Sequence, residues 1–322
     1  METFTEIGQF RSVVKQVRQY YDRIQSPHLI PTLTFVGTSK LHGTNGGLRR
    51  KNGKIQPQSR NNIISVENDN CGFAKFISGI PESVLNELFD TISSNPDDEI
   101  TLYGEWAGKG IQSGVGVAEL DRFWALFAAR KNGMMVPSVD GLDAPAHRIF
   151  NVADAGFFKV KVDFKNPEAA IVEFERRTMD VENECPFAKV HGVSGIGEGI
   201  VWRCVERPSD TDLWFKTKGT KHSNSKVKKV ATVDIEKVNG INACVDLVLP
   251  QGRLDQGFDY FRENQIDIDP KNMGQYLKWI SGDVLKEETD TIQGNGFEWK
   301  DVQKVITVRA REYFFKKYNE SI

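Results

Sequence analysis

The sequence predicts an α+β fold in two parts: a large domain of antiparallel β-sheets flanked by helices, followed by a small domain made only of helices. Three observations lead to this prediction. Short strand-like runs separated by glycine, proline, asparagine and aspartate recur through the first two thirds of the chain. Two segments among them repeat apolar residues at helical spacing, and helical spacing dominates near the C-terminus. We therefore place the first domain at residues 1–230 and the second at residues 231–322.

The first domain begins with a predicted helix and continues into a strand and a hairpin. Residues 7–24 carry apolar side chains three and four positions apart, which is typical of a helix with one buried face. From Leu33 the pattern changes to that of a strand, and two more strand-like segments follow, joined by the turn signal Asn52-Gly53. A second amphipathic helix is predicted at residues 81–92.

Further strand-like runs complete the first domain. They are rich in β-branched and aromatic residues and are bounded by turn-forming residues. They lie at residues 99–106, 122–130, 169–177, 199–206 and 212–218. The second domain has helical spacing at residues 275–285 and 299–318. The basic tract at residues 216–229 has two open interpretations, a linker between domains or a solvated connector.

The composition excludes several classes of protein. With 39% hydrophobic and 10% aromatic residues, a chain of 322 residues can form a sizeable core. No segment has the apolar length that a membrane span requires, and the N-terminus shows no signal-peptide or transit-peptide pattern. The 4 cysteines are far apart and form no Cys-x-x-Cys pair, which fits reduced thiols and argues against a zinc site. We therefore expect a cytoplasmic protein with no membrane partner.

Polar motifs at the ends of the predicted strands carry the functional signal. The first is Lys40-Leu41-His42-Gly43, where a strand passes into a glycine-rich turn. A lysine in a turn is ordinarily a solvated charge, so its meaning depends on the other motifs. They follow in this order: Arg60, Tyr-Gly-Glu at 103–105, Phe-Trp at 123–124, Glu-Gly-Ile-Val at 198–201 and Phe-Lys-Thr-Lys at 215–218.

This ordered set of motifs resembles that of the covalent nucleotidyltransferases, the superfamily of polynucleotide ligases and capping guanylyltransferases. It is most similar to the branch typified by bacteriophage T4 RNA ligase 2, in which histidine replaces the aspartate of the Lys-x-Asp-Gly motif. The resemblance covers residues 30–220 in its motifs, while the helical tail matches only in kind and length. It implies that the first domain has the nucleotidyltransferase fold and that the second binds RNA.

The chemistry implied for Lys40 sets requirements on its surroundings. The resemblance makes its amine the group that attacks the α-phosphorus of ATP, and the amine must then be unprotonated, whereas the ordinary lysine pKa is about 10.4. Nearby positive charge and partial burial both lower a lysine pKa. Lys216 and Lys218 point to the same face of their strand and would supply that charge. The resemblance assigns both to the α-phosphate; the alternative is an exposed edge strand with solubilising lysines.

Two glutamates and one aromatic residue are implied to complete the nucleotide site. Glu105 and Glu198 each lie beside a glycine at the end of an apolar strand, where carboxylates can bind ribose hydroxyls or a hydrated divalent ion. The resemblance makes Glu105 the ribose and metal contact, and it places Glu198 in the metal and phosphate environment, with Mg²⁺ or Mn²⁺ as the ion. Phe123 matches the ring that stacks on the base. Its neighbour Trp124 stays open as the alternative, because adjacent strand residues point to opposite faces.

The resemblance also places further residues around the nucleotide: Leu41, His42, Asn45 and Arg60. Asn45 and Arg60 match residues near the ribose, the phosphate and the RNA ends, and His42 occupies the branch-specific position that is expected to aid the later transfer steps. Two positions depart from the pattern. Ser39 stands where relatives usually carry glutamate before the lysine, so a main-chain carbonyl would have to read the base. Ala128 stands where an acidic residue is common.

The resemblance implies an ATP-dependent RNA ligase. Such an enzyme forms lysyl-AMP and then an RNA-adenylate, and it joins 3′-hydroxyl and 5′-phosphate ends. We expect the substrate to be a nick in duplex RNA and the protein to be a monomer, encoded by a phage for RNA repair and acting in the host cytoplasm. Because the formal net charge is only −2, contact with RNA would depend on local basic patches. One such patch follows from residues near the C-terminus: Arg309, Arg311, Lys316 and Lys317.

Three other functions stay open at this point: a DNA ligase, a capping-type guanylyltransferase and an RNA-binding module without catalysis. The histidine of the Lys-x-His-Gly motif argues against a DNA ligase. The helical tail argues against a capping enzyme, because that group typically appends a small β-barrel. The intact set of charged motif residues argues against loss of catalysis. The glycine-rich segments 107–116 and 195–199 lack the spacing of a P-loop and of a dinucleotide-binding fingerprint.

Overall fold

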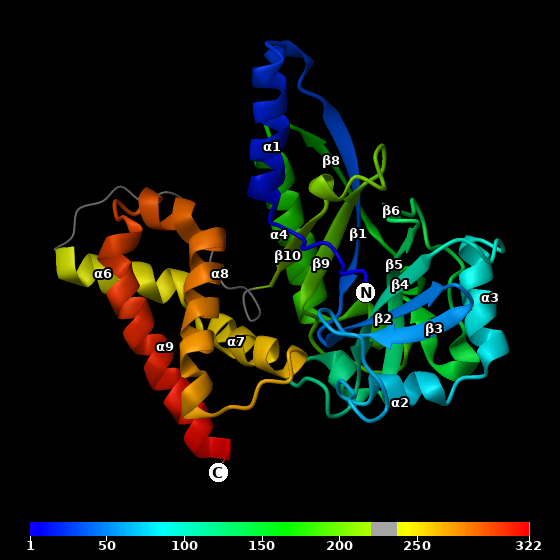
Figure 1. Cartoon of the computed structure of the whole chain (residues 1–322). Helices are drawn as coiled ribbons and strands as arrows, with labels where there is room; N and C mark the ends of the chain where they lie inside the picture. The colour runs from blue at the N-terminus through cyan, green and yellow to red at the C-terminus, as the bar shows by residue number, and fades with distance from the viewer. Residues whose placement is uncertain (220–236, 322) are drawn as a thin grey trace. The chain divides into compact units, whose positions relative to one another are not determined.

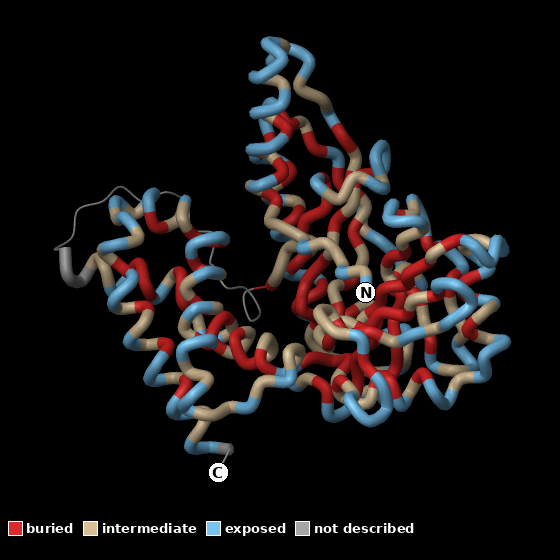
Figure 2. The backbone as a smooth tube through the Cα atoms, in the orientation of Figure 1, coloured by how far each residue is buried: buried red, intermediate tan, exposed pale blue. Residues whose placement is uncertain are grey.

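The computed structural model describes residues 1–219 and 237–321, which belong to two compact units (Figure 1). Unit 1, Met1–Gly219, combines two mainly antiparallel sheets with helices. The described part of unit 2, Thr220–Ile322, is helical. Buried residues concentrate in the interior of each unit (Figure 2). The α+β fold class is therefore confirmed, while the predicted boundary at residues 230 and 231 lies outside the described residues.

Sheet A has the strand order β10-β9-β1-β8, and each neighbouring pair is antiparallel. Its strands are β1 (Thr32–Lys40), β8 (Phe158–Asp163), β9 (Gly199–Cys204) and β10 (Phe215–Lys218). Every second residue of β1 from Leu33 to Ser39 is buried, whereas the residues between them are partly exposed. The buried face packs against α1 (Phe10–Arg23) and α4 (Glu168–Asn183). Lys40, at the end of β1, therefore lies on the face that these helices leave uncovered.

Sheet B has the order β3-β2-β4-β5-β6, and a short strand β7 pairs in parallel with β5. Its strands are β2 (Thr44–Lys51), β3 (Lys54–Gln58), β4 (Ile100–Ala107), β5 (Phe123–Lys131), β6 (Met134–Met135) and β7 (Ile149–Asn151). The helices α2 (Phe73–Ser78) and α3 (Glu82–Ile92) pack on one face around a core that includes Leu102 and Trp124. The predicted turn is confirmed, since Asn52 and Gly53 have φ values of 51° and 70° between β2 and β3.

The strand predicted at residues 169–177 is wrong, because this segment lies in α4. Adjacent β-branched residues favoured a strand, but Glu173 pairs with Arg176 at 2.6 Å and with Arg177 at 2.8 Å, at the one-turn spacing of a helix. Phe174 and other apolar residues on the same side then pack on sheet A. Strands β7 and β8 were not predicted. A short helix α5 (Pro186–Val190) and several 3₁₀ turns complete unit 1: Pro27–Leu29, Gly116–Glu119, Pro145–His147, Val152–Ala155 and Thr211–Leu213.

Unit 2 contains four described helices around one apolar core. They are α6 (Lys237–Val248), α7 (Gln251–Glu263), α8 (Met273–Gly294) and α9 (Trp299–Ser321), with a 3₁₀ turn at Pro270–Asn272. The helical predictions at residues 275–285 and 299–318 are confirmed and fall inside longer helices, whereas α6 and α7 were not predicted. No helix within the described residues is long and apolar enough to cross a membrane.

An arginine is fully buried in unit 2. Arg253 on α7 has no exposed surface, and its Nη2 lies 3.0 Å from Oε1 of Glu288, which is equally buried. Its Nε lies 2.7 Å from Oδ2 of Asp283, and its Nη1 donates a hydrogen bond to the carbonyl of Val248. The second oxygen of Glu288 accepts from Thr291 at 2.7 Å. These contacts join α6, α7 and α8 around the fully buried charges of Arg253 and Glu288, while Asp283 is 20% exposed.

Candidate active site

The register of sheet A brings two predicted lysines to the same point. Gly199 on β9 pairs with Lys40 of β1 on one side and with Lys218 of β10 on the other. Because paired residues of an antiparallel ladder share a face, the two lysines flank one position of the sheet. A Cβ at Gly199 would lie 2.0 Å from the carbonyl oxygen of Thr217. The absence of a side chain there allows β9 and β10 to approach closely next to Glu198.

Glu198 is the buried centre of the candidate site. Only 3% of its side chain is exposed, and its Oε2 lies 2.6 Å from Nζ of Lys40, while its Oε1 lies 2.9 Å from Nζ of Lys218. The Nδ1 atom of His42 lies 3.6 Å from the same Oε2. Burial acts to raise the pKa of this carboxyl, but Lys218, Lys40 and the hydrogen bond with His42 outweigh it and hold the pKa well below its ordinary value. Glu198 is therefore ionised at neutral pH.

The pKa of Lys40 moves in the direction opposite to the sequence prediction. Burial acts to lower it, and the charge of Arg60 acts in the same direction, but attraction to Glu198 and Glu105 raises the pKa above its ordinary value. Neighbouring lysines alone would lower the pKa of Lys40, but the carboxylate of Glu198 lies between Lys40 and Lys218 and has the larger effect. The predicted lowering of the Lys40 pKa is therefore wrong. The amine at rest is a protonated partner in an ion pair, and it must leave Glu198 before it can act as a nucleophile.

This ion pair predicts a pH dependence with a defined sign. The raised pKa of Lys40 means that its pairing stabilises the fold below about pH 10.4, the unfolded value, and is lost as the pH rises through the folded pKa. The lowered pKa of Glu198 means that its pairing stabilises the fold above about pH 4.3 and is lost as the pH falls through the folded pKa.

A Glu198→Gln variant is therefore expected to make the Lys40 amine reactive at lower pH, because the carboxylate that raises the pKa of this amine is removed. Competitive labelling with acetic anhydride in the presence of a chelator, read by peptide mass spectrometry across a pH series, measures this shift. Lys109 is the matched control, because its exposed amine pairs with Asp121 at 3.4 Å and should keep the same profile in both proteins. An unchanged Lys40 profile would contradict the ion-pair geometry.

Sheet B supplies a second group of polar atoms. Asn45 on β2 pairs with Glu105 on β4, so that their side chains share a face. Oε1 of Glu105 accepts a hydrogen bond of 2.9 Å from the backbone N–H of Gly43, in the turn that follows Lys40. Oδ1 of Asn45 is buried and has no hydrogen-bond partner within the described part of the chain. Because a buried acceptor is rarely left unpaired, this oxygen is suited to a ligand donor.

The aromatic residues of β5 differ in how accessible their rings are. Phe123 is 1% exposed and stacks on Phe187, with ring centroids 5.2 Å apart and an interplanar angle of 22°. Trp124 lies in the core on the opposite face and donates to the carbonyl of Gly46 at 2.9 Å. Phe127 is half-buried and has no partner on β4, because the register shifts there and forms a β-bulge. A bulge re-aims a side chain, and the alternating pattern of the sequence did not reveal it.

The remaining predicted residues have different surroundings. Lys216 pairs with Val201 on the face of sheet A that carries Lys40. Arg60 is half-buried, and no carboxylate forms an ion pair with it in the described residues. Leu41 is 4% exposed and packs in the same apolar cluster as Phe123. The structure therefore brings Lys40, Lys218 and His42 into direct contact with Glu198. Glu105 is connected to this group through Gly43, and the positive charge of Arg60 acts on Lys40.

A family model and several solved structures are similar to this chain. A family model described as RNA ligase matches residues 33–218. None of the curated proteins matches the chain. Similar solved structures include two lysine mutants of the RNA ligase of Naegleria gruberi, one with AMP and Mn and one with ATP and Mn. Both are 15% identical over 68% of this chain, with TM-scores of 0.44 and 0.45. A further one is the Naegleria gruberi RNA ligase with PPi, at 14% identity, 68% coverage and a TM-score of 0.44.

The extent of these matches differs. The chain spans 56% or 57% of the length of the solved Naegleria proteins, at low identity. The family match runs from Leu33, the second residue of β1, to the end of β10 and thus includes residues of every strand of both sheets. It also includes all of the predicted motif residues from Lys40 to Lys218. Since the matched residues make up more than half of the chain, this protein belongs to the RNA ligase family.

Proposed function

We propose that this protein is an ATP-dependent RNA ligase of the T4 RNA ligase 2 branch, which joins 3′-hydroxyl and 5′-phosphate ends at nicks in duplex RNA. One observation supports this proposal most directly. The buried carboxylate of Glu198 lies 2.6 Å from the amine of Lys40 and 2.9 Å from the amine of Lys218, so that two positive charges surround one negative charge. The net positive charge that remains suits a nucleotide phosphate. The histidine at position 42 supports the assignment to the branch.

The first step of the proposed reaction adenylylates the protein. The amine of Lys40, freed from Glu198 and deprotonated, attacks the α-phosphorus of ATP, and a nitrogen–phosphorus bond forms as the bond to pyrophosphate breaks. Lys216 and Lys218 bind the α-phosphate and stabilise the charge that develops on its oxygens. Arg60, which forms no ion pair with a described carboxylate, provides a further cation for the phosphates or the RNA end.

The oxygen atoms of the site fit a hard divalent cation. The carboxylates of Glu105 and Glu198 and the unpaired Oδ1 of Asn45 are the donors that would hold Mg²⁺ or Mn²⁺. The described residues contain no group of three or more His, Cys, Asp and Glu side chains that could hold a metal ion, so we expect nucleotide oxygens and water to complete the coordination. The cation would supply charge neutralisation of the triphosphate. Glu105 and Asn45 would also bind the ribose hydroxyls.

For the base we propose stacking on an aromatic ring of β5. The family resemblance assigns this role to Phe123, which is almost completely buried. Phe127 is the stronger candidate, because its half-buried ring belongs to the clusters formed on the Glu105 side of sheet B. Leu41 would then support the apolar wall near the nucleotide. Ser39 has a buried Oγ without a partner among the described residues. A main-chain carbonyl, and not the side chain at this position, would then contact the edge of the base.

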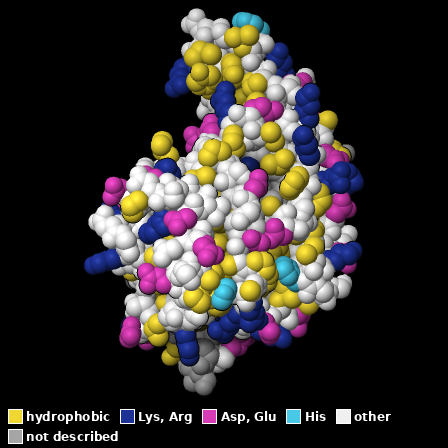
Figure 3. All heavy atoms as spheres, turned by 90° about the vertical axis from the view of Figure 1, so that its right-hand side faces the viewer, with side chains coloured by type: hydrophobic (Ala, Val, Ile, Leu, Met, Phe, Trp, Pro, Cys, Tyr) yellow, Lys and Arg dark blue, Asp and Glu magenta, His cyan; other side chains and the backbone are white. Residues whose placement is uncertain are grey.

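The later steps transfer AMP to the RNA 5′-phosphate and then seal the strand. We propose that His42, 3.6 Å from Glu198, assists them. Unit 2 would hold the duplex through phosphate contacts from Arg311, Lys316 and Lys317. Of the basic residues near the C-terminus, Arg309 is already paired with Asp246, and Lys317 lies 3.3 Å from Glu320. On the face shown in Figure 3, Lys and Arg side chains are interspersed with Asp and Glu. Binding of RNA would therefore use local basic contacts. We also propose that the protein is a monomer and acts in the cytoplasm.

Intact-mass spectrometry tests the proposed function. Wild-type protein incubated with magnesium and ATP is expected to gain the mass of one adenylate, and on addition of a nicked RNA duplex with a 5′-phosphate it is expected to release AMP and join the strand. GTP and a nicked DNA duplex are the matched controls. Labelling by GTP would favour a capping enzyme, and efficient joining of DNA would favour a DNA ligase. An unmodified protein that still binds RNA would favour a binding module.

A further inference from the structure

The N-terminal segment, residues 2–8, links sheet B to sheet A. It precedes residues 33–218, which match the family model, so that the family match says nothing of it. We propose that this segment positions the ring of Phe127 for the nucleotide base, with Phe4 as the positioning residue. The proposal rests on the proposed function, because it takes a nucleotide base as the ligand of that ring.

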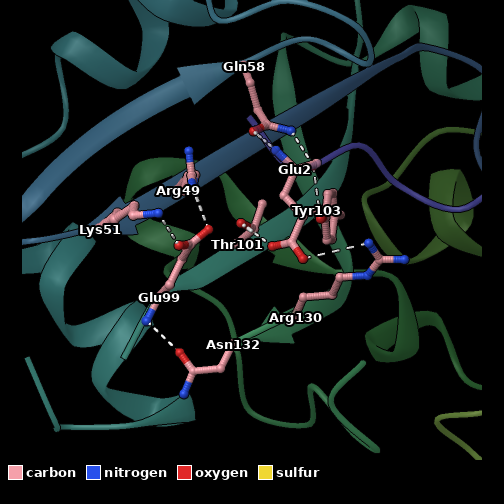
Figure 4. A network of polar contacts seen from close by, with 9 residues as sticks. All are labelled: Glu2, Arg49, Lys51, Gln58, Glu99, Thr101, Tyr103, Arg130 and Asn132. Atoms are coloured by element: carbon pink, nitrogen blue, oxygen red, sulfur yellow. Dashed lines mark hydrogen bonds and ion pairs between the residues drawn. The ribbon is translucent and has the colours of Figure 1, made fainter. Parts of the chain in front are cut away.

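One end of the segment is fixed on sheet B by Glu2 (Figure 4). Its backbone N–H donates to Oε1 of Gln58 at 3.3 Å, and its carbonyl accepts from Nε2 of Gln58 at 2.8 Å and from the hydroxyl of Tyr103 at 3.0 Å. Its carboxylate accepts from Thr101 at 3.0 Å and lies 3.6 Å from Nη1 of Arg130. These partners come from β3, β4 and β5, so that the segment is attached across three strands.

The other end is fixed on sheet A. Gly8 forms a parallel β-bridge with Phe215, at the start of β10. Its carbonyl accepts a hydrogen bond of 3.0 Å from the backbone N–H of Lys216. The segment is therefore held at both ends by backbone hydrogen bonds, and the residues between them have little freedom to move away from the protein.

Phe4 lies between these two ends and contacts Phe127 directly. The two ring centroids are 5.0 Å apart at an interplanar angle of 67°, an edge-on contact. Phe4 also lies 5.1 Å from Tyr103 and 6.1 Å from Trp214. The backbone behind the ring is held as well, because Arg203 donates to the carbonyl of Phe127 and stacks 4.1 Å from the centre of the Trp214 ring.

A bulged residue needs such support. Phe127 lacks a cross-strand partner on β4, so the β4–β5 ladder does not determine the direction of its ring. Closely packed neighbours hold a side chain in one rotamer, and a cavity in place of Phe4 would let the ring of Phe127 turn away from a stacked base. Loss of one aromatic contact is expected to weaken ATP binding about three- to tenfold.

The experiment compares equilibrium binding of ATP and of pyrophosphate in full-length variants. Phe4→Ala is expected to raise the Kd for ATP about three- to tenfold and to leave the Kd for pyrophosphate unchanged, because pyrophosphate has no base. In adenylylation assays the same variant is expected to raise KM for ATP, with kcat within about twofold of wild type. Phe4→Tyr should restore ATP binding. Thr3→Ala is the matched control, since Thr3 is exposed and its carbonyl, which accepts from Arg130, is retained.

The outcomes separate this inference from the proposed function. A wild-type protein that binds ATP but is never adenylylated would contradict the proposed function, while the effect of Phe4→Ala on ATP binding would still test the inference. Equal weakening of ATP and pyrophosphate binding, or no change in either, would overturn the role of Phe4. A wild-type protein that fails to bind ATP would overturn both.

Discussion

Replacement of Lys40 by alanine is expected to abolish adenylate transfer to the protein. Loss of the nucleophile of a covalent mechanism lowers the rate by more than about a thousandfold. The variant should fold, because the Lys40 side chain is 23% exposed at the end of β1 and Glu198 keeps its partner Lys218 at 2.9 Å. After incubation with magnesium and ATP, intact-mass spectrometry would show one adenylate on the wild type and none on the variant.

Two further substitutions make the Lys40 result specific. Lys40→Arg keeps the positive charge but is expected to be inactive, because a guanidinium is not deprotonated at usable pH. Lys109→Ala removes a lysine that is 63% exposed, and it should accept adenylate as the wild type does. An adenylate found on either Lys40 variant would mean that another side chain is the nucleophile.

Replacement of Arg253 by methionine is expected to unfold much of unit 2. The change leaves the fully buried carboxylate of Glu288 without its cation, and breaking a buried ion pair in this way costs about 3–5 kcal/mol. A protein with two units has no single unfolding transition. Hydrogen exchange of peptides from α7 and α8, measured by mass spectrometry, is therefore the suitable measurement, and exchange there should become much faster than in the wild type.

A double variant tests the physical reason for this loss. Arg253→Met combined with Glu288→Leu removes both buried charges and should recover much of the protection, because an apolar pair of similar volume is often neutral for stability. Arg262→Met is the matched control, since Arg262 is 42% exposed and its ion pair with Asp259 is long, at 3.4 Å. Its effect should be below about 0.5 kcal/mol. Equal loss in the single and double variants would show that packing, and not the unpaired charge, determines the effect.

The sequence predicted the parts of the fold that local patterns determine. The hairpin at Asn52-Gly53 depends on two residues with positive φ, and β1 depends on simple alternation, so both could be read from neighbouring residues. The segment 169–177 could not be resolved in this way, because a short apolar run fits either a strand or a buried helix face. Tertiary packing decides between a strand and a helix here, because apolar residues of this segment pack against the buried face of sheet A as one side of a helix.

The candidate site was only partly predictable for a different reason. Motif order identified Lys40 and Glu198, but they are separated by 158 positions, and their contact depends on the register of β1 and β9. Register is a property of the assembled sheet, and the raised pKa of Lys40 follows from it. Phe127 was missed because one extra residue in β5 interrupts the alternation on which strand predictions depend.

The missing side chain at Gly199 makes the site sensitive to a very small change. Even one methyl group would meet the oxygen of Thr217 at 2.0 Å and would force β10 outward, taking Lys218 with it. The backbones of β9 and β10 are so close at Gly199 that the site has no room for one added carbon atom. Anyone who transplants these motifs into another scaffold has to reproduce that spacing as well as the charged residues.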